Sequence, residues 1–200
     1  MRATDTTADD APTRRPANRR ELILEAAVEL FHRHGYPATS VDDIGKAVDV
    51  SGPAIYRHFS SKEDLLVEAI TLAADEVHAV NRVARADTDD PRALLTGYIR
   101  AYTDVALERS ALIAVWTSER RHLSRERRSP MGRRLRSWTH EWTDALQAAR
   151  PELDDDAFLL VTAAIGLITS VATGPDRRDD PHLAENIVTM ALATLDAPVR

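Results

Sequence analysis

Apolar residues recur along most of this chain at the spacing of one helix face. The first such stripe joins Leu22, Ala26 and Leu30, and Gly35 follows it closely as a helix stop. Further helices are expected at 41–47, 52–58, 61–85, 91–108, 110–122, 132–149, 155–173 and 181–196. No segment shows the sustained alternation of a half-exposed strand. The pattern predicts an all-α protein of about nine helices.

Two of these boundaries have specific signals. Ser60 is followed three residues later by Glu63, a spacing that is typical of a capping box at the start of the helix at 61–85. Pro130 lies in a polar break, and a proline is expected to interrupt a helix. The next helix is therefore expected to begin at residue 132.

Composition narrows the functional classes. The chain has 200 residues, of which 44% are hydrophobic and 29% charged, as in a globular protein. It has no Cys, which excludes disulfide frameworks, iron–sulfur clusters, Cys-bound zinc and thiol catalysis. The N-terminal segment lacks the apolar core of a secretory signal, and the longest nearly apolar run, 157–172, is too short to span a membrane. We therefore expect a cytoplasmic protein without a membrane partner.

Charge is distributed unevenly along the chain. The formal net charge of −6 alone argues against nucleic acid as a partner. Residues 14–62, however, hold eight basic and six acidic side chains, so that the excess of acid lies beyond them. We therefore expect a disordered basic arm (1–17), a helical head that faces phosphates (18–62) and an acidic body (63–200).

The two short helices at 41–47 and 52–58 form the most informative segment. A sharp turn separates them, and Asp49 in this turn tolerates a left-handed backbone better than most residues. Ile55 and Phe59, four residues apart, would hold the second helix on the rest of the head. Such a helix-turn-helix can insert its second helix into the major groove of DNA. From spacing alone, a tight helical hairpin that binds nothing remains the alternative.

A Tyr-x-His-Phe group follows a Val-Ser turn in this segment, with a Lys three residues beyond it. The full pattern comprises Gly35, Tyr36, Thr39, Val41, Ile44, Ala47, Val50, Ser51, Ile55, Tyr56, His58, Phe59, Lys62, Glu63 and Leu65. This pattern resembles the DNA-binding head of TetR-type (tetracycline-repressor-type) transcriptional regulators. The resemblance covers residues 19–66, and the rest of the chain matches only in length and helical content.

The resemblance implies a ligand-responsive regulator, by default a repressor, that binds palindromic operator DNA as a homodimer. The phosphate contacts that it implies are Thr39 or Ser40, Tyr56, His58 and Lys62. The base contacts that it implies are Gly52, Pro53, Ala54 and Arg57. Of the base contacts, Arg57 alone has the donor fork that reads guanine, so we expect it to carry most of the sequence preference.

Two positions depart from the pattern of the family. Gly45 stands where the family usually has Ala, and Asp49 stands where it usually has Gly. Gly45 weakens its helix by up to about 1 kcal/mol but allows close packing. Asp49 must either hold an unusual backbone or shift the turn.

The middle helices of the body contain aromatic stripes at helical spacing. Because ligand pockets are commonly apolar and aromatic with a few polar groups, we expect a pocket for a small, largely apolar effector here. The candidate pocket residues are Leu95, Tyr98, Ile99, Tyr102, Leu112, Trp116, Met131, Leu135, Trp138, Trp142, Phe158 and Thr162. An ordinary hydrophobic core is the alternative for each residue. Eight Arg between positions 120 and 136 indicate either a solvated helix end or an anion-binding mouth for an acyl-CoA-like effector.

Residues 157–172 are apolar on nearly every side, and such a helix has to be covered all round. A second subunit would provide this cover together with the last helix, and the resemblance implies the same four-helix dimer interface. The candidate interface residues are Leu160, Ala164, Leu167, Val171, Ile187, Ala191 and Leu195. The alternative is the central core helix of a monomer.

Two other classes are a helical adaptor that does not bind DNA and an all-α enzyme. The chain contains no Gly-rich phosphate loop, nucleophile elbow or carboxylate–His metal spacing. We therefore expect no catalytic residue, no metal and no cofactor. Operator binding would distinguish a regulator from an adaptor.

Overall fold

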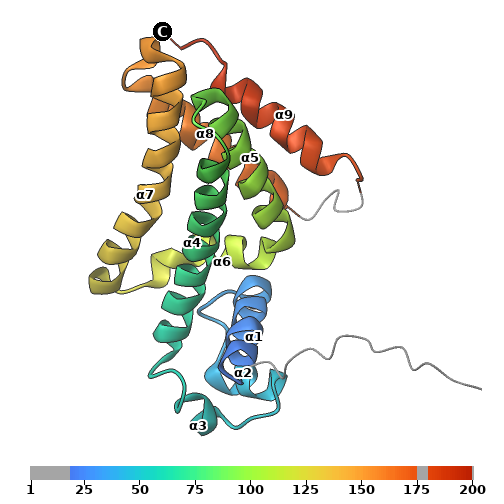
Figure 1. The fold of residues 1–200 in the computed structure, drawn as a ribbon. Helices are drawn as coiled ribbons and strands as arrows, with labels where there is room; N and C mark the ends of the chain where they lie inside the picture. Colours follow the sequence, from blue (N-terminus) through green and yellow to red (C-terminus); the bar gives the residue numbers. More distant parts are fainter. Residues whose placement is uncertain (1–18, 175–179, 200) are drawn as a thin grey trace, which may run out of the picture.

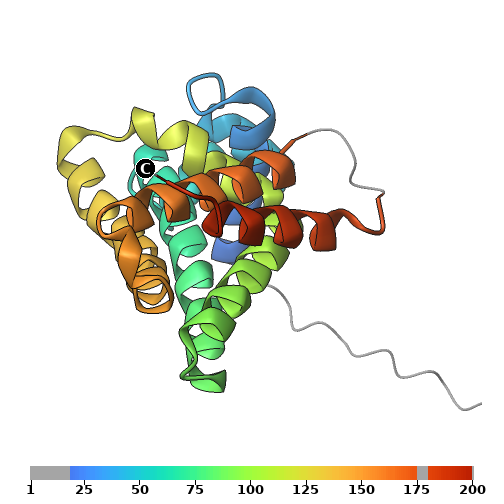
Figure 2. The same cartoon turned by 90° about the horizontal axis from the view of Figure 1, so that it is seen from above.

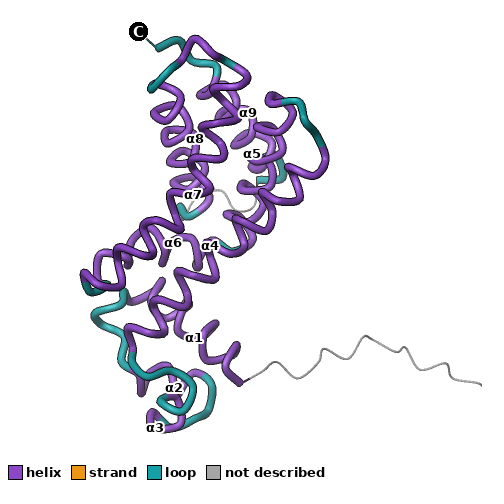
Figure 3. Tube along the Cα trace, turned by 60° about the vertical axis from the view of Figure 1, so that its left-hand side comes forward, coloured by secondary structure: helices purple, strands orange, loops and turns teal. Residues whose placement is uncertain are grey.

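The computed structural model describes residues 19–174 and 180–199, apart from the side chains of residues 130, 131 and 134–136. This part of the chain is all-helical and contains no strand, which confirms the predicted fold class (Figure 3). Its α-helices are α1 (Arg19–His34), α2 (Val41–Ala47), α3 (Gly52–Ile55), α4 (Lys62–Asp87), α5 (Pro91–Glu108), α6 (Ser110–Glu119), α7 (Arg125–Ala149), α8 (Asp156–Ala172) and α9 (Leu183–Leu195). Two 3₁₀ helices, η1 (Arg120–His122) and η2 (Pro151–Leu153), flank α7.

The molecule is elongated, with a small head and a larger body (Figure 1). The head consists of α1, α2 and α3, and α4 runs from the head deep into the body. Ile23, Phe31, Ile44 and Ile55 meet in the core of the head, where at most 1% of each is exposed. The expected boundary between head and body at residues 62 and 63 therefore falls in the first turn of a helix that both parts share.

The body packs α5 and α7 against α4, while α8 and α9 lie side by side across its far end (Figure 2). Five aromatic rings form a continuous stack inside this bundle. Tyr98 stacks on Trp142 with their ring centres 5.7 Å apart, and Trp142, Trp138 and Trp116 then follow in edge-to-face contacts, with Tyr102 beside Trp138. Large rings supply much buried area in a small core, so the stack joins α5, α6 and α7.

The start of α7 differs from the prediction. The helix begins at Arg125, so Pro130 lies inside it and not before it. A proline removes one backbone hydrogen bond, a loss that contacts elsewhere can offset. Here the Ser124 amide donates to Glu63 at 2.6 Å, and Arg127 forms ion pairs with Glu63 and Asp64 of α4. Tertiary contacts to α4 therefore hold the first turns of α7 in place.

The predicted N-cap of α4, Ser60, was also wrong by one residue. Ser61 is the N-cap, and its hydroxyl accepts a hydrogen bond from the Asp64 amide at 3.0 Å. Glu63, which the capping-box spacing assigned to the cap, faces the Ser124 amide instead. No helix in the described part of the chain is long and apolar enough to cross a membrane.

Candidate functional site

The helix-turn-helix begins with a complete capping box on α2. The Ser40 hydroxyl accepts from the Asp43 amide at 3.1 Å, and the Ser40 amide donates to the Asp43 carboxylate at 3.2 Å. The Ser40 hydroxyl also donates to the Asp43 carboxylate, and this bond and the one from the Ser40 amide lower the pKa of Asp43. Ser40 therefore provides the cap, whereas the neighbouring Thr39 turns inward.

Gly45 and Asp49 shape the turn between α2 and α3. Asp49 adopts a left-handed backbone with φ of 54°, as its position in the sharp turn indicated. The Val50 amide donates back to the Gly45 carbonyl at 2.9 Å, which folds the turn onto α2. A Cβ at position 45 would lie 2.6 Å from the Val50 carbonyl oxygen. The close approach of the turn thus explains why glycine stands there.

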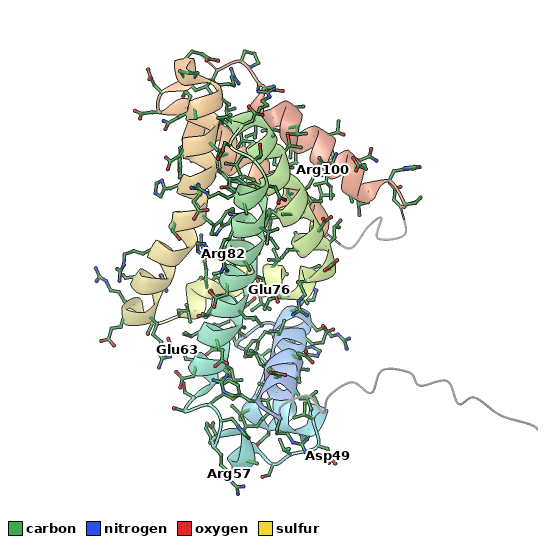
Figure 4. The ribbon with its side chains drawn as sticks, viewed as in Figure 1. Asp49, Arg57, Glu63, Glu76, Arg82 and Arg100 are labelled. Atoms are coloured by element: carbon green, nitrogen blue, oxygen red, sulfur yellow. The ribbon has the colours of Figure 1, made fainter. Side chains whose placement is uncertain are left out.

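The residues after the turn form a short, exposed end of the head. Ile55 and Phe59 are buried and anchor it, as their spacing predicted. Arg57 and His58 are exposed, and Tyr56 is 53% exposed. Figure 4 shows Arg57 at the tip of the head, pointing away from the rest of the molecule.

The nine predicted DNA contacts differ in accessibility. Ser40, Pro53, Tyr56, Arg57 and His58 are exposed, and Ala54 and Lys62 are half-buried. Gly52 and Thr39 are buried, and the Thr39 hydroxyl donates to the carbonyls of Leu30 (3.2 Å) and Gly35 (3.0 Å). The side chain of Thr39 therefore holds the loop after α1, which leaves only its backbone for a phosphate.

Lys62 also has internal partners. Its ammonium group donates to the carbonyls of Tyr36 and Thr39 at 2.8 Å each and lies 4.3 Å from the centre of the Tyr36 ring. Partial burial lowers the pKa of Lys62. Two of its three N–H donors thus fasten α4 to the loop at 35–40, and one donor remains for an external anion.

The same loop is joined to the body by Glu119, at the end of α6. The Glu119 carboxylate accepts from the Tyr36 amide at 3.1 Å and lies 3.5 Å from His122 Nε2. The rings of Tyr36 and His122 stack with their centres 5.7 Å apart. Only 6% of Glu119 is exposed. Sequence reasoning gave Glu119 no role in the head, although an acid that ends an otherwise apolar helix was an available signal.

A partly open pocket of about 390 Å³ lies in the body between α5, α6, α7 and α8. Of the twelve predicted pocket residues, the pocket is lined by Tyr102, Trp116, Trp138, Phe158 and Thr162. Its other described lining residues are Thr117, Arg120, Gly132, Thr139, Ile165 and Thr169. Their spacing from the predicted ones, such as Trp116 to Arg120 or Thr162 to Thr169, is that of one helix face and could have identified them.

Five other predicted pocket residues belong to the core. Leu95, Tyr98, Ile99, Leu112 and Trp142 are at most 5% exposed and do not line this pocket. The Tyr98 hydroxyl accepts from Arg85 at 3.2 Å, and the Trp142 indole donates to Asn81 at 3.4 Å, so their polar atoms are satisfied within the bundle. The side chains of Met131 and Leu135 lie outside the described part.

The predicted dimer residues lie mostly in the core of the protomer. Leu160, Ala164, Ile187, Ala191 and Leu195 are at most 5% exposed, while Leu167 and Val171 are half-buried. The exposed stripe of α8 lies one residue earlier at each step and comprises Leu159, Ala163, Gly166 and Ser170. A shift of one residue rotates a helix face by about 100°. Most of the predicted interface residues therefore face the core of the protomer, and the neighbouring stripe is the one open to a partner.

Two of the arginines between 120 and 136 are engaged within the protein. Arg127 pairs with Glu63 and Asp64, and Arg128 donates to the carbonyls of Arg121 (2.7 Å) and Leu123 (2.9 Å). The hydrogen bond from the Ser124 amide and the charge of Arg127 lower the pKa of Glu63. Arg127 and Arg128 thus attach the start of α7 to α4 and to the preceding loop.

The family model of bacterial regulatory proteins of the tetR family matches residues 23–69. The repressor KstR2 of Mycolicibacterium smegmatis is 28% identical over 162 residues, which cover 74% of this chain and 76% of KstR2. The activator FasR of the same organism is 36% identical over 86 residues, or 43% of this chain and 39% of FasR.

The fold also extends to a solved relative. The structure of the ketosteroid transcriptional regulator KstR2 of Mycobacterium tuberculosis superposes with a TM-score of 0.77 at 27% identity. The superposition covers 91% of this chain and 95% of that one, so it includes the body as well as the head. With an exposed helix-turn-helix and a helical body that holds a pocket, the chain is similar along most of its length to TetR-family transcriptional regulators, and its head at residues 23–69 matches the family model itself.

Proposed function

We propose that the protein is a ligand-responsive transcriptional repressor that binds a palindromic operator as a homodimer. The observation that carries this proposal is the exposed end of the head, where Pro53, Tyr56, Arg57 and His58 project together while Ile55 and Phe59 anchor them. A second helix so short contacts bases mainly through a few side chains. Arg57, with its bidentate fork, is the one suited to guanine.

A repressor is favoured by the breadth of the similarity. KstR2, which is named a repressor, matches across three quarters of this chain, whereas the activator FasR matches over less than half of it. The sign of regulation depends on where the operator lies relative to a promoter. A reporter gene behind the selected operator measures it directly, and transcription that rises with the protein would contradict repression.

Homodimer formation is supported by the open face of α8. Leu159, Ala163 and Gly166 form a stripe of apolar and small residues, and a Cβ built at Gly166 meets no atom within 4 Å. Small residues allow two helices to approach closely, and exposed apolar stripes of this kind mark interaction sites. Met190 of α9, 43% exposed, adds to the apolar surface at this end of the body.

The effector site that we propose is the pocket of about 390 Å³. Its volume falls within the roughly 300–1,000 Å³ that ligand pockets occupy. One turn of α6 and η1 contributes Trp116 and Arg120 to the pocket and Glu119 to the head. A ligand that moves this turn would therefore change the position of the loop at 35–40, and DNA is released if the ligand favours the displaced state.

Selection from random DNA duplexes tests the proposed function. We expect an enriched inverted repeat whose half-sites are about 34–36 Å apart, or a multiple of that distance, because two recognition helices must meet the major groove on one side of the duplex. A protein that enriches no site at moderate salt is no operator-binding regulator. A single, unpaired half-site would contradict the dimer.

A further inference from the structure

The charged and polar lining of the body pocket indicates what kind of molecule it takes. Four of its eleven described lining residues are aromatic, and Arg120 is the one charged residue among them. The side chain of Arg120 forms no ion pair or hydrogen bond within the described part of the chain, and no Asp or Glu lines the pocket there. Among the described residues, no carboxylate therefore neutralises the guanidinium at this rim.

A second group in the same pocket also lacks a partner. Trp138 is 2% exposed, and its indole N–H makes no hydrogen bond within the described part of the structure. A buried donor without an acceptor costs free energy, and such a cost is commonly explained by a ligand or water that satisfies it. Trp138 lines the pocket, so an acceptor atom of a bound molecule is the natural partner.

Size limits the ligand further. A volume of about 390 Å³ is at the small end of the range for ligand pockets, so the pocket itself suits a compact molecule. Outside the pocket, Arg127 and Arg128 are already engaged with Glu63, Asp64 and two backbone carbonyls. Among the described residues, the cation that lines the pocket itself is therefore Arg120, at its rim.

We propose that the effector is a compact aromatic or alicyclic carboxylic acid, bound as the free anion, with its carboxylate on Arg120 and an acceptor oxygen on the Trp138 indole. This proposal rests on the proposed function, since it assigns the chemical class of the effector to the same pocket. Arg120 directly follows Glu119, which holds the Tyr36 amide. An anion that draws Arg120 into the pocket therefore acts on the turn that is fastened to the head.

Calorimetric titration with matched compounds tests the proposal. The probes are a panel of aryl and fused-ring carboxylic acids, among them 2-naphthoate, each with its primary amide and its coenzyme A thioester. We expect an acid to bind about tenfold or more tightly than its amide, which is the size of a charge-assisted hydrogen bond. Thioesters that bind more tightly than every free acid would overturn the proposal, as would equal binding of acids and amides or no binding by any probe.

Two variants separate the two contacts. Arg120→Gln should abolish the preference for acid over amide, while Arg125→Gln, an exposed Arg that does not line the pocket, should leave it unchanged. Trp138→Phe should weaken acid and amide by the same factor of several-fold, because it removes only the N–H donor. A preference for acid that survives Arg120→Gln contradicts the carboxylate contact.

The outcome is independent of the operator experiment. If the protein selects an inverted repeat but prefers coenzyme A thioesters or neutral compounds, the regulator stands and the effector class is wrong. If acids bind with the expected preference but no duplex is enriched, the pocket assignment stands and operator binding fails.

Discussion

Gly45 and Asp49 are best understood as a pair. The left-handed Asp49 brings the Val50 carbonyl oxygen against α2, where only a residue without a Cβ leaves enough room. The family usually has Ala at the position of Gly45 and Gly at the position of Asp49. The glycine then stands in the turn and not in the helix. The turn can therefore be closed either with a glycine in the helix or with a glycine in the turn.

Gly45→Ala should consequently destabilise the head by about 1–3 kcal/mol, the usual cost of overpacking, even though Ala is the better helix former. Asp49→Gly alone should be nearly neutral, because two effects oppose each other. Gly relieves the strain of the left-handed backbone, but it also raises the conformational entropy of the unfolded chain. In the double variant the freed turn can move away from the new Cβ. Chemical denaturation of all four proteins should therefore show non-additivity, and purely additive free energies of unfolding would refute the pairing.

Arg57→Ala should cost about 1–3 kcal/mol at the preferred operator and relax one base position, because the fork of Arg57 reads a base edge. Lys46→Ala, which removes an exposed basic side chain from α2, is the matched control and should weaken all duplexes alike. Binding of a library of operator variants measures both effects. If the two variants gave the same base profile, Arg57 would be a phosphate contact and not a reader.

Lys62 shows where residue types alone mislead. The family pattern indicates a phosphate contact, but two of its donors hold the carbonyls of Tyr36 and Thr39. Sequence could not reveal this role, because the partners are backbone atoms 23 and 26 residues away. The hydroxyl of Thr39 is engaged for the same reason, since a buried hydroxyl requires partners wherever the chain provides them.

At the scale of elements, the bond from Glu119 to the Tyr36 amide links α6 to the head. Glu119→Ala should cost about 1.5–3 kcal/mol, the range for a hydrogen bond to a charged group, and should speed hydrogen exchange of the amides at 35–40. Glu119→Gln keeps an acceptor oxygen and should retain most of this protection. Hydrogen exchange that is equal in the Ala and Gln variants would show that the contact does not hold the loop.

The attachment of α7 to α4 should depend on pH through Glu63. Its pKa is lowered in the folded protein, so its contribution to stability is complete above the ordinary value of 4.5 and is lost as the pH falls through the lowered value. The difference in the free energy of unfolding between the wild type and Glu63→Gln should therefore shrink between about pH 6 and pH 3. Glu126→Gln, which alters an exposed acid in the first turn of α7, should show no such trend.

The sequence predicts the helices themselves better than their ends and faces. Apolar spacing located every α-helix of the described chain, because burial of one face requires it. Pro130 misled at α7, where ion pairs to α4 outweigh the proline. In α8 no polar face fixes the rotation of the helix, so the inward stripe and the open stripe could not be distinguished from the sequence. Of the candidate pocket residues with described side chains, half line the pocket and half lie in the core, because a pocket wall and a core have the same composition.

At the scale of the whole molecule, regulation requires that two heads reach one duplex together. In each elongated protomer the head lies at one end, and α8 and α9 lie across the other (Figure 1). An interface through α8 would therefore set the distance between the two recognition helices of a dimer. A dimer loses translational and rotational freedom only once when it binds two half-sites, whereas two separate monomers lose it twice. Operator affinity therefore depends steeply on dimer formation.

Ala163→Arg tests this arrangement, because Ala163 lies in the middle of the exposed stripe of α8 and has a side chain that faces no core. A long charged side chain there should leave the protomer folded, since nothing inside it is displaced, yet it should bury an unpaired charge in the interface and dissociate the dimer. Ala148→Arg, at an exposed alanine of α7, is the matched control. Sedimentation should then give a monomer for Ala163→Arg and a dimer for the control, with operator affinity lost by at least tenfold in the first alone. A dimeric Ala163→Arg variant that still binds the operator would move the interface away from this face of α8.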